Sequence, residues 1–296
     1  MKILVIGSRG QLGTEACRCA AARGHEVVPL DLPEVDISRA EDAESAVGDS
    51  GPTLVVNAAA YTDVDRAESE PAKAFAVNRD GPRHLAAACA RRGIPLIHVS
   101  TDYVFDGNRR SPYRESDPVC PLGVYGLSKA EGEREVKRHL EQHIILRTAW
   151  LYGAAGRNFV KTMLRLGKER EILRVVSDQY GSPTSAAALA EAILGISDFI
   201  SRGENIRWGT YHCAGTGEPI TWHGFAEAVF ELAGGRVNLK VKEVVPIPTS
   251  EYPTPARRPA YSTLDCSRIM ESFGIVLPSW KESLDKVVGE LCGPQA

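Results

Sequence analysis

Lys2-Ile-Leu-Val-Ile-Gly-Ser-Arg-Gly-Gln-Leu-Gly13 begins as a short apolar strand and continues as a Gly-x-x-Gly-x-x-Gly loop. The next residues, Gln11–Arg23, have a helical pattern that ends at Gly24. Glycines permit a tight turn and close backbone approach, so a pyrophosphate can rest on the unpaired amides at the start of that helix. The order of strand, loop and helix predicts nucleotide binding, with a structural turn as the alternative. The spacing is looser than the Gly-x-Gly-x-x-Gly form.

Asp31 follows the second expected strand, Glu26–Leu30, where a carboxylate can accept hydrogen bonds from the adenosine ribose of a dinucleotide. A carboxylate at this position repels a 2′-phosphate and therefore favours NADH. Arg9, in the glycine loop, could instead meet that phosphate. The sequence leaves the choice between NADH and NADPH open.

The first two-thirds of the chain alternate short apolar runs with helical segments. Such runs, separated by helices, are typical of a parallel sheet buried on both faces. Right-handed crossovers then give an α/β fold with a Rossmann-type doubly wound sheet. The expected strands are Lys2–Ile6, Glu26–Leu30, Thr53–Asn57, Ile94–Ser100 and Ile144–Arg147, and a helix is expected over Asp80–Arg92.

After Leu151 the chain changes to helices joined by proline-rich connections. Helices are expected at about Asn158–Gly167, Ala186–Ser201 and Thr221–Gly234. The segment 245–259 contains five prolines and is predicted to be a long irregular loop. Long ordered loops in compact domains are often binding loops, and a plain surface loop is the alternative.

Composition places the chain among ordinary globular proteins, because 43% of its 296 residues are hydrophobic and 25% are charged. The formal net charge of −3 gives no basic field for nucleic acid or an anionic membrane. No apolar run approaches the ~20 residues of a membrane span, and Ile3–Ile6 is too short for a signal-peptide core. The seven scattered cysteines have neither disulfide nor metal-ligand spacing. We therefore expect a cytoplasmic protein that binds neither nucleic acid nor membrane.

Tyr125 and Lys129 are spaced so that they share one face of a helix that begins near Val124. A nearby ammonium favours the ionised form of a phenol, which lowers its pKa from the usual value of about 10. A tyrosine tuned in this way can exchange a proton with a carbonyl or alcohol oxygen. The spacing alone also fits an ordinary amphipathic helix.

Two further segments end expected strands with small or polar residues. His98-Val-Ser-Thr-Asp-Tyr-Val-Phe105 closes the fourth strand, and Asn57-Ala-Ala-Ala-Tyr-Thr62 closes the third. Ligands of doubly wound sheets bind at the carboxyl ends of the strands. A hydroxyl in the first segment can bond a substrate oxygen, and small residues in the second let a cofactor lie against the backbone. Strand termination and packing are the alternatives.

Taken together, these motifs resemble the extended short-chain dehydrogenase/reductases, and within them the dTDP-4-dehydrorhamnose reductases. The resemblance spans nearly the whole chain. It rests on Gly7-Ser-Arg-Gly-Gln-Leu-Gly13, Val56-Asn-Ala-Ala-Ala-Tyr-Thr-Asp-Val-Asp65, Ala67-Glu-Ser-Glu-Pro71, Ser100-Thr-Asp-Tyr-Val-Phe-Asp-Gly107, Arg147-Thr-Ala-Trp150, Asn158-Phe159, Lys161-Thr-Met-Leu164, Asp178-Gln-Tyr-Gly-Ser-Pro-Thr184, Tyr252-Pro-Thr-Pro-Ala-Arg-Arg-Pro259 and Leu277-Pro278.

The resemblance implies a role for each matching residue. Tyr125 is expected to be the proton donor, Lys129 to tune it and hold the nicotinamide ribose, and Thr101 to bind the substrate carbonyl. The cofactor, NADPH or NADH, is expected to lie against Gly7, Gly10, Gln11, Leu12, Asp31, Asp36, Ile37, Ala60, Tyr61, Thr62, Val99, Tyr125 and Lys129. The nucleotide sugar is expected to contact Val64, Thr101, Asp102, Tyr103 and Trp150, with the Asn158–Phe159 region and Arg257/Arg258 near its diphosphate.

The implied reaction is reduction of the C4 keto group of dTDP-4-dehydro-L-rhamnose to dTDP-L-rhamnose, the last step of dTDP-rhamnose synthesis. The alternatives are a reductase or epimerase for another nucleotide-4-keto sugar, or a non-catalytic subunit of the same fold. Residues 1–150, with a segment near 184–204, are expected to bind the dinucleotide, and residues 151–296 mainly the substrate. Some relatives dimerise through acidic residues and magnesium. No comparable carboxylate cluster is evident here. The sequence therefore leaves open whether the chain is a monomer or a homodimer and whether it binds a magnesium ion.

Overall fold

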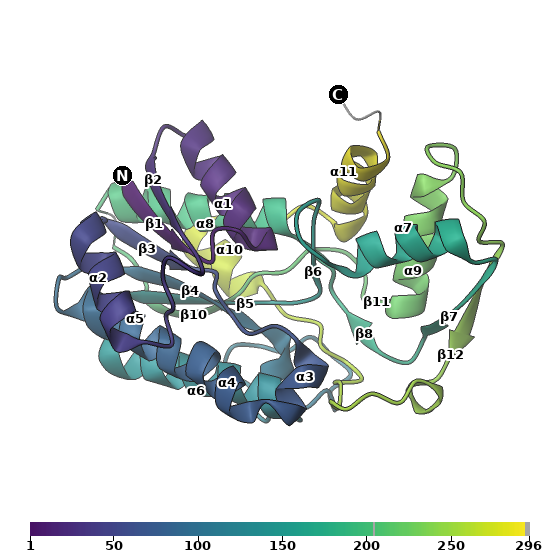
Figure 1. The fold of residues 1–296 in the computed structure, drawn as a ribbon, viewed down its shortest axis with the longest axis horizontal. Coiled ribbons are helices and arrows are strands. Elements are labelled where there is room, and N and C mark those ends of the chain that lie inside the picture. Colours follow the sequence, from purple (N-terminus) through teal and green to yellow (C-terminus); the bar gives the residue numbers. More distant parts are fainter. Residues whose placement is uncertain (204, 294–296) are drawn as a thin grey trace.

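A parallel sheet of six strands forms the centre of the larger part of the molecule, in the order β2-β1-β3-β4-β5-β10 (Figure 1). The structure is a computed structural model and describes residues 1–203 and 205–293. The sheet confirms the predicted doubly wound α/β class. Its strands are β1 (Lys2–Ile6), β2 (Glu26–Leu30), β3 (Leu54–Asn57), β4 (Leu96–Thr101), β5 (His143–Thr148) and β10 (Gly209–His212).

Helices cover both faces of this sheet, which explains why its strands are apolar almost throughout. Successive side chains of β1 point to opposite faces: Ile3 and Val5 belong to one buried cluster, and Leu4 and Ile6 to the other. The first face packs against α1 (Gln11–Ala22), α8 (Ala186–Ser201) and α10 (Ser267–Phe273). The second packs against α2 (Ala40–Ser50), α5 (Gly81–Ala90) and α6 (Val124–His139).

Short helical segments lead from two strands of the sheet toward the helices that cover it. After β3 the chain forms α3 (Val64–Ser69), α4 (Pro71–Phe75) and a π-helical turn, η1 (Ala76–Asp80), which runs directly into α5. After β4 it forms a short 3₁₀ turn, η2 (Asp102–Val104). Both segments place polar loop residues at the carboxyl edge of the sheet.

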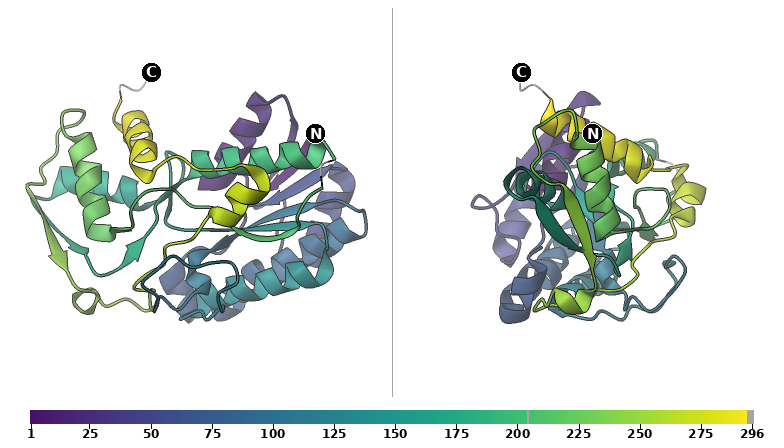
Figure 2. Two further views of the ribbon diagram at one scale, coloured as in Figure 1. Left: turned by 180° about the vertical axis from the view of Figure 1, so that it is seen from behind. Right: turned by 90° about the vertical axis from the view of Figure 1, so that its right-hand side faces the viewer.

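The smaller part of the molecule lies beyond the carboxyl ends of the strands (Figures 1 and 2). Three of its helices, α7, α9 and α11, share one buried apolar cluster that includes Tyr152, Phe225 and Trp280. Its elements are β6 (Leu151–Tyr152), α7 (Phe159–Glu169), β7 (Ile172–Val176), β8 (Tyr180–Gly181), β9 (Thr184–Ser185), β11 (Ile220–Thr221), α9 (Trp222–Ala233), β12 (Glu243–Ile247), η3 (Thr249–Glu251) and α11 (Trp280–Cys292).

The segments predicted as strands and helices are all present, with ends that differ by a few residues. The long loop is an exception at its start, because residues 245–247 belong to β12, which pairs in parallel with β7. Pro246 is accommodated there because β12 and β7 form a sheet of two strands, so its missing N–H lies on an open edge. From Tyr252 to Pro259 the chain is irregular, as predicted.

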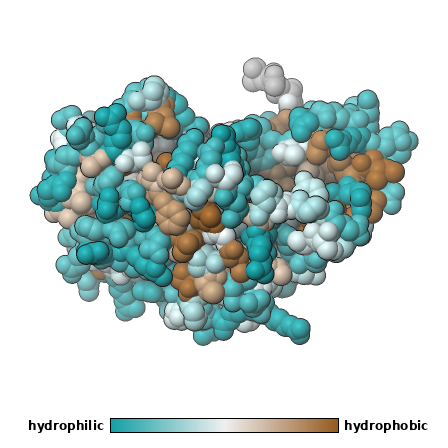
Figure 3. Space-filling view, turned by 60° about the horizontal axis from the view of Figure 1, so that its bottom comes forward, coloured by the Kyte–Doolittle hydropathy of each residue, from teal (hydrophilic) through white to brown (hydrophobic). Residues whose placement is uncertain are grey.

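The surface is mainly hydrophilic, with hydrophobic side chains gathered near the middle of one face and at the end that holds β7 and β12 (Figure 3). Ile172 of β7 is one of the most exposed large apolar side chains, at 57%. Over the described residues, none of the helices combines the length and apolar character that crossing a bilayer requires.

Candidate active site

A cavity of about 670 Å³ lies at the carboxyl ends of β1, β3 and β4, where it also meets the smaller part of the molecule. Strand order reverses between β1 and β3, because the chain moves from β1 outward to β2 and then returns to the other side of β1. Ligands of open α/β sheets bind at such a switch point. Helix α6 supplies Tyr125 and Lys129 to one wall, and α9 supplies Trp222 to another.

The structure brings nearly all of the residues predicted from the sequence to this one cavity. The lining includes the glycine loop, the residues after β2, β3 and β4, the two α6 residues and Trp150. Those members are Gly7, Gly10, Gln11, Leu12, Asp31, Asp36, Ile37, Ala60, Thr62, Val64, Val99, Thr101, Asp102, Tyr103, Tyr125, Lys129 and Trp150.

Tyr61 is the exception among the predicted cofactor residues, since it is not part of the lining. Its phenol donates to Glu70 Oε2 at 3.0 Å, and its backbone N–H donates to Asn78 Oδ1 at 2.8 Å. The side chain is therefore turned toward α4, while its neighbours Ala60 and Thr62 face the cavity. A three-residue motif in an extended loop cannot point all its side chains the same way.

The glycine loop is packed so tightly that side chains are excluded at two positions. A Cβ on Gly13 would lie 2.0 Å from the Gly7 carbonyl oxygen. A Cβ on Gly7, whose φ is +79°, would lie 2.6 Å from the Ala59 amide nitrogen. Helix α1 begins at Gln11 after Gly10, which has no side chain to cap the first amides. This cradle fits an anionic pyrophosphate.

Asp31 lies at the end of the cavity next to the glycine loop, with both carboxylate oxygens bonded to backbone. Oδ2 accepts from the Arg9 N–H at 2.8 Å, and Oδ1 accepts from the Leu32 N–H at 2.8 Å. The Arg9 guanidinium is drawn away by the Leu32 carbonyl and by the Glu34 carboxylate, which it meets at 2.5 Å. The charge of Arg9 is thus engaged within its own surface cluster.

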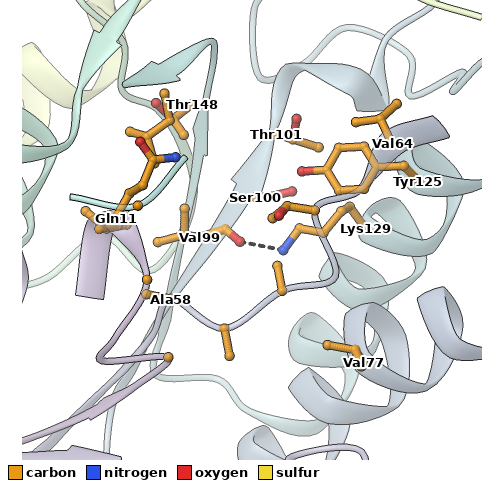
Figure 4. Close-up of a pocket in the computed structure, with 18 of the residues that line it drawn as sticks. Gln11, Ala58, Val64, Val77, Val99, Ser100, Thr101, Tyr125, Lys129 and Thr148 are labelled. Atoms are coloured by element: carbon orange, nitrogen blue, oxygen red, sulfur yellow. Dashed lines mark hydrogen bonds between the residues drawn. The ribbon is translucent and has the colours of Figure 1, made fainter. Parts of the chain in front are cut away.

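Tyr125, Thr101 and Lys129 meet at the wall formed by α6 and β4, where the phenol and the threonine side chain point toward the same part of the cavity (Figure 4). Thr101 Oγ1 donates to Asp102 Oδ1 at 3.0 Å and accepts from the Tyr103 N–H at 3.2 Å. Lys129 Nζ donates to the Val99 carbonyl at 2.7 Å, which ties the ammonium to β4. Backbone contacts therefore hold the Thr101 hydroxyl and the Lys129 ammonium, and α6 sets the position of Tyr125.

The lowered tyrosine pKa predicted from the spacing is wrong for this structure. Burial raises the pKa of Tyr125 to about 12, and a hydrogen bond between its phenol and Thr101 opposes the shift. Burial also lowers the pKa of Lys129 to about 8, while the Glu133 charge acts in the other direction. Both shifts favour the neutral form, because desolvation penalises a charge more than the i, i+4 neighbour stabilises it.

Asp102 and Tyr103 complete this wall beside Tyr125. Burial raises the pKa of the Asp102 carboxyl to about 6, although hydrogen bonds from Ser262 and Thr101 oppose it. Burial likewise raises the pKa of Tyr103, whose ring packs edge-on against the Tyr125 ring with centroids 5.4 Å apart. The Tyr103 ring thus covers part of the Tyr125 ring, and the Tyr125 hydroxyl faces the cavity.

Sequence reasoning missed several lining residues, of which Trp222 is the clearest. Its indole stacks on that of Trp150, with centroids 3.4 Å apart and planes inclined by 2°. Trp150 has a φ of +48°, which is rare for a residue with a large side chain. Gly181 leaves room for this indole, since a Cβ there would lie 2.3 Å from Trp150 Cε2. Other lining residues to which the sequence assigned no role include Thr148 and Arg157.

Of the residues expected near a diphosphate, Asn158 lies at the cavity and Arg258 does not. Asn158 lines the cavity, and its amide donates to Gln11 Oε1 at 3.0 Å, which joins the smaller part of the molecule to the glycine loop. Arg258 instead forms a bidentate pair with Asp65, at 2.7 and 3.1 Å. Over residues 1–203 and 205–293, no three His, Cys, Asp or Glu side chains are grouped to hold a metal ion.

Comparison with known proteins agrees with this geometry. The model of the RmlD substrate binding domain family matches residues 1–292. The chain belongs to this family. It is 45% identical to a dTDP-4-dehydrorhamnose reductase of Burkholderia thailandensis, over 98% of this chain and 99% of the relative.

Solved structures of the same family have the same fold. The dTDP-4-dehydrorhamnose reductase of Clostridium acetobutylicum superposes with a TM-score of 0.90 at 40% identity, over 98% of this chain and 99% of that one. The Bacillus anthracis enzyme, solved in complex with NADP, gives a TM-score of 0.90 at 37% identity, with the same coverage. The sheet and the cavity described above thus belong to a fold shared over the full length.

Burial of Lys129 generates a prediction about stability. Because its pKa is about 8 in the folded chain and about 10.4 when unfolded, the unfolded state binds more protons between these values, and stability rises with pH there. We expect Lys129→Met to raise the free energy of unfolding at pH 7 by about 1–3 kcal/mol. The advantage should shrink as pH rises from 8 to 10.

Urea denaturation at unit pH intervals measures this difference. Lys242→Met is the matched control, because that lysine side chain is 72% exposed and pairs with Glu171 at the surface. If the free energies of unfolding of Lys129→Met and the parent chain differed by a constant amount across pH 7–10, the assigned desolvation of Lys129 would be contradicted.

Proposed function

We propose that this chain reduces the C4 keto group of dTDP-4-dehydro-L-rhamnose to dTDP-L-rhamnose with NAD(P)H, the last step of dTDP-rhamnose synthesis. The observation that carries the proposal is the meeting of Tyr125, Thr101 and Lys129 in one cavity with the glycine loop. Relatives of the same family, matched over nearly their full length, are dTDP-4-dehydrorhamnose reductases.

In the proposed reaction Tyr125 donates its proton to the C4 oxygen. The raised pKa of its phenol keeps that proton in place at neutral pH, which is the state a donor needs. Thr101 binds the same oxygen through its hydroxyl and so orients the carbonyl. Lys129 lies one helical turn from Tyr125, where a protonated ammonium stabilises the phenolate left behind.

The cradle formed by Gly7, Gly10 and the first amides of α1 supports a nicotinamide dinucleotide as the cofactor. When bound, it supplies the hydride, and the protein contributes orientation and electrostatics. We propose that Asp31 meets the adenosine ribose and that the chain favours NADH, because the Arg9 charge is already engaged by Glu34. Lys129 would hold the nicotinamide ribose from α6.

The side of the cavity opposite the glycine loop is proposed to hold the nucleotide sugar. The stacked indoles of Trp150 and Trp222 offer an aromatic surface for a base or a sugar face. We propose that residues 1–150, joined by α8, bind the cofactor, and that residues 151–296 mainly bind the substrate. The packing of α8 against the sheet beside α1 supports the return of that helix to the first part.

Replacing Tyr125 with phenylalanine tests the proton donor. We expect the rate of NADH oxidation with dTDP-4-dehydrorhamnose to fall by roughly 10²–10⁴-fold, since general acid catalysis contributes about that much, while NADH binding is retained. Tyr211→Phe is the control, because its phenol bonds the Arg207 carbonyl away from the cavity. Near-normal turnover by Tyr125→Phe would refute the assigned role. A parent chain that turns over only other nucleotide-4-keto sugars would support the alternative substrate.

Replacing Glu34 with glutamine tests the coenzyme assignment. The change releases Arg9 to meet a 2′-phosphate, so we expect the ratio of kcat/KM for NADPH to that for NADH to rise roughly two- to fivefold, as exposed ion pairs are weak. Glu26→Gln, which removes a surface partner of Lys2, is the matched control. An unchanged ratio would show that Glu34 does not restrain Arg9 in this way.

Replacing Trp222 with leucine tests the aromatic surface. We expect KM for the nucleotide sugar to rise about tenfold, because stacking on a base contributes roughly 1–3 kcal/mol, with little change in the Kd of NADH. Trp208→Leu is the control, since that indole packs near the first sheet face, remote from the lining. Equal effects on substrate and coenzyme would indicate general loss of structure instead.

A further inference from the structure

Helix α6 carries four polar residues at intervals of four: Tyr125, Lys129, Glu133 and Lys137. Residues spaced in this way lie above one another on a single helix face. The first two line the cavity, and Glu133 lies one turn behind Lys129, with a side chain only 2% exposed. The face therefore passes from the proposed reaction site directly into a buried charged cluster.

The Glu133 carboxylate is held by donors from two neighbouring strands. Oε1 accepts from Ser100 Oγ at 2.7 Å and from Arg147 Nε at 2.8 Å. Oε2 accepts from Arg147 Nη2 at 2.7 Å and lies 3.7 Å from Lys137 Nζ. The Arg147 side chain is also only 2% exposed, so this is a buried bidentate pair.

These contacts fix the spacing of the catalytic wall. Ser100 immediately precedes Thr101 on β4, and Arg147 immediately precedes Thr148 on β5. One carboxylate thus ties α6, which carries Tyr125 and Lys129, to both strands from behind the cavity.

The same carboxylate supplies a negative charge to Lys129. Burial lowers the pKa of Lys129, and the charge of Glu133 is the influence that raises it. Glu133 itself stays ionised, because Arg147 holds the pKa of its carboxyl below the usual value despite burial. Arg147 therefore acts on Lys129 indirectly, because it keeps the Glu133 carboxylate ionised.

We propose that Glu133 is a positioning residue that keeps Lys129 protonated and aligned with Tyr125 for the reaction. This inference rests on the proposed function, since it assigns the ammonium a role in coenzyme binding and in stabilising the tyrosinate. Arg147 and Ser100 are the groups through which Glu133 is held in place.

The other titratable groups around α6 are neutral or have partners of their own, apart from Asp102 of η2, whose pKa of about 6 lies below the alkaline range. On β4, burial and the Lys129 charge hold the pKa of His98 well below its usual value, so it stays neutral. His212 of β10 lies 3.5 Å from Arg147 Nη1, and burial lowers its pKa to about 3. Neighbouring elements contribute groups with partners of their own, which are Glu68 bonded to the Val124 amide, the pair Arg79–Asp80, and His143 bonded to the Leu140 carbonyl.

Glu133→Gln tests the inference by removing the charge while keeping the shape. We expect the alkaline limb of the kcat/KM profile to move down by about one pH unit from the Lys129 pKa of about 8, which is an extra loss of about sixfold at pH 8.5 relative to pH 6.5. The Kd of NADH, measured by energy transfer from tryptophan to the nicotinamide, should weaken over the same pH range. Glu133→Asp keeps the charge and should retain the position of the limb, even where the rate falls.

Glu131→Gln is the matched control on the same helix, because that carboxylate pairs with Arg134 at the surface. If Glu133→Gln does not fold, because it leaves Arg147 buried without its partner, the double variant Glu133→Gln/Arg147→Met replaces it and should show the same shift. The proposal is overturned if either charge-removing variant folds and its kcat/KM profile keeps the alkaline limb at the same pH as in the parent chain. Failure of both variants to fold also overturns it, since the pair would then act in folding alone.

The two readouts separate this inference from the proposed function. If the parent chain does not reduce dTDP-4-dehydrorhamnose, the proposed function fails. The pH dependence of NADH binding would still decide whether Glu133 controls Lys129. If turnover is normal in the parent chain and neither profile moves in the variants, only the inference fails.

Discussion

One buried carboxylate, Glu133, ties α6 to the neighbouring strands β4 and β5 behind the cavity. A buried ion pair stabilises only when its geometry and remaining hydrogen bonds are complete, because desolvation of both charges is costly. Here Arg147 binds in a bidentate manner and Ser100 satisfies a further lone pair. The register of α6 against β4 and β5 is therefore strongly specified, and with it the placement of Tyr125 relative to Thr101.

The reversal of strand order at β1 provides the second constraint. It leaves a space at the carboxyl edge that neither β1 nor β3 fills, and the glycine loop enters that space with no side chain at Gly7 or Gly13. The smaller part then closes the cavity from outside, where the Asn158 amide bonds Gln11 beside the loop. The two parts of the chain thus meet at one edge of the sheet, and residues of both line the cavity.

Much of this arrangement could be predicted from the sequence, because it depends on local patterns. Apolar runs identified five of the six strands of the sheet but not β10, and the spacing of Tyr125 and Lys129 placed them on one helical face. Trp222 gave no such signal, since its partner Trp150 is far away along the chain. Glu133 continues the spacing of Tyr125 and Lys129, but the spacing could not reveal its buried pair with Arg147, which lies on another element. The predicted direction of the Tyr125 pKa shift was wrong for a related reason. Spacing along a helix indicates which side chains are close, whereas desolvation depends on what the whole fold places around a side chain.

The raised pKa of Tyr125 suits the proton donation proposed for its phenol. Burial keeps the phenol neutral before reaction, so the proton is available when the C4 oxygen gains charge. The phenolate that forms is the state an adjacent ammonium stabilises, and the neutral phenol gains far less from it. Interactions that strengthen only as charge develops lower the barrier without tightening ground-state binding. A raised resting pKa and a neighbouring lysine are therefore compatible requirements of the proposed reduction, provided that Lys129 keeps its own proton, and in this fold the charge of Glu133 acts to secure that proton.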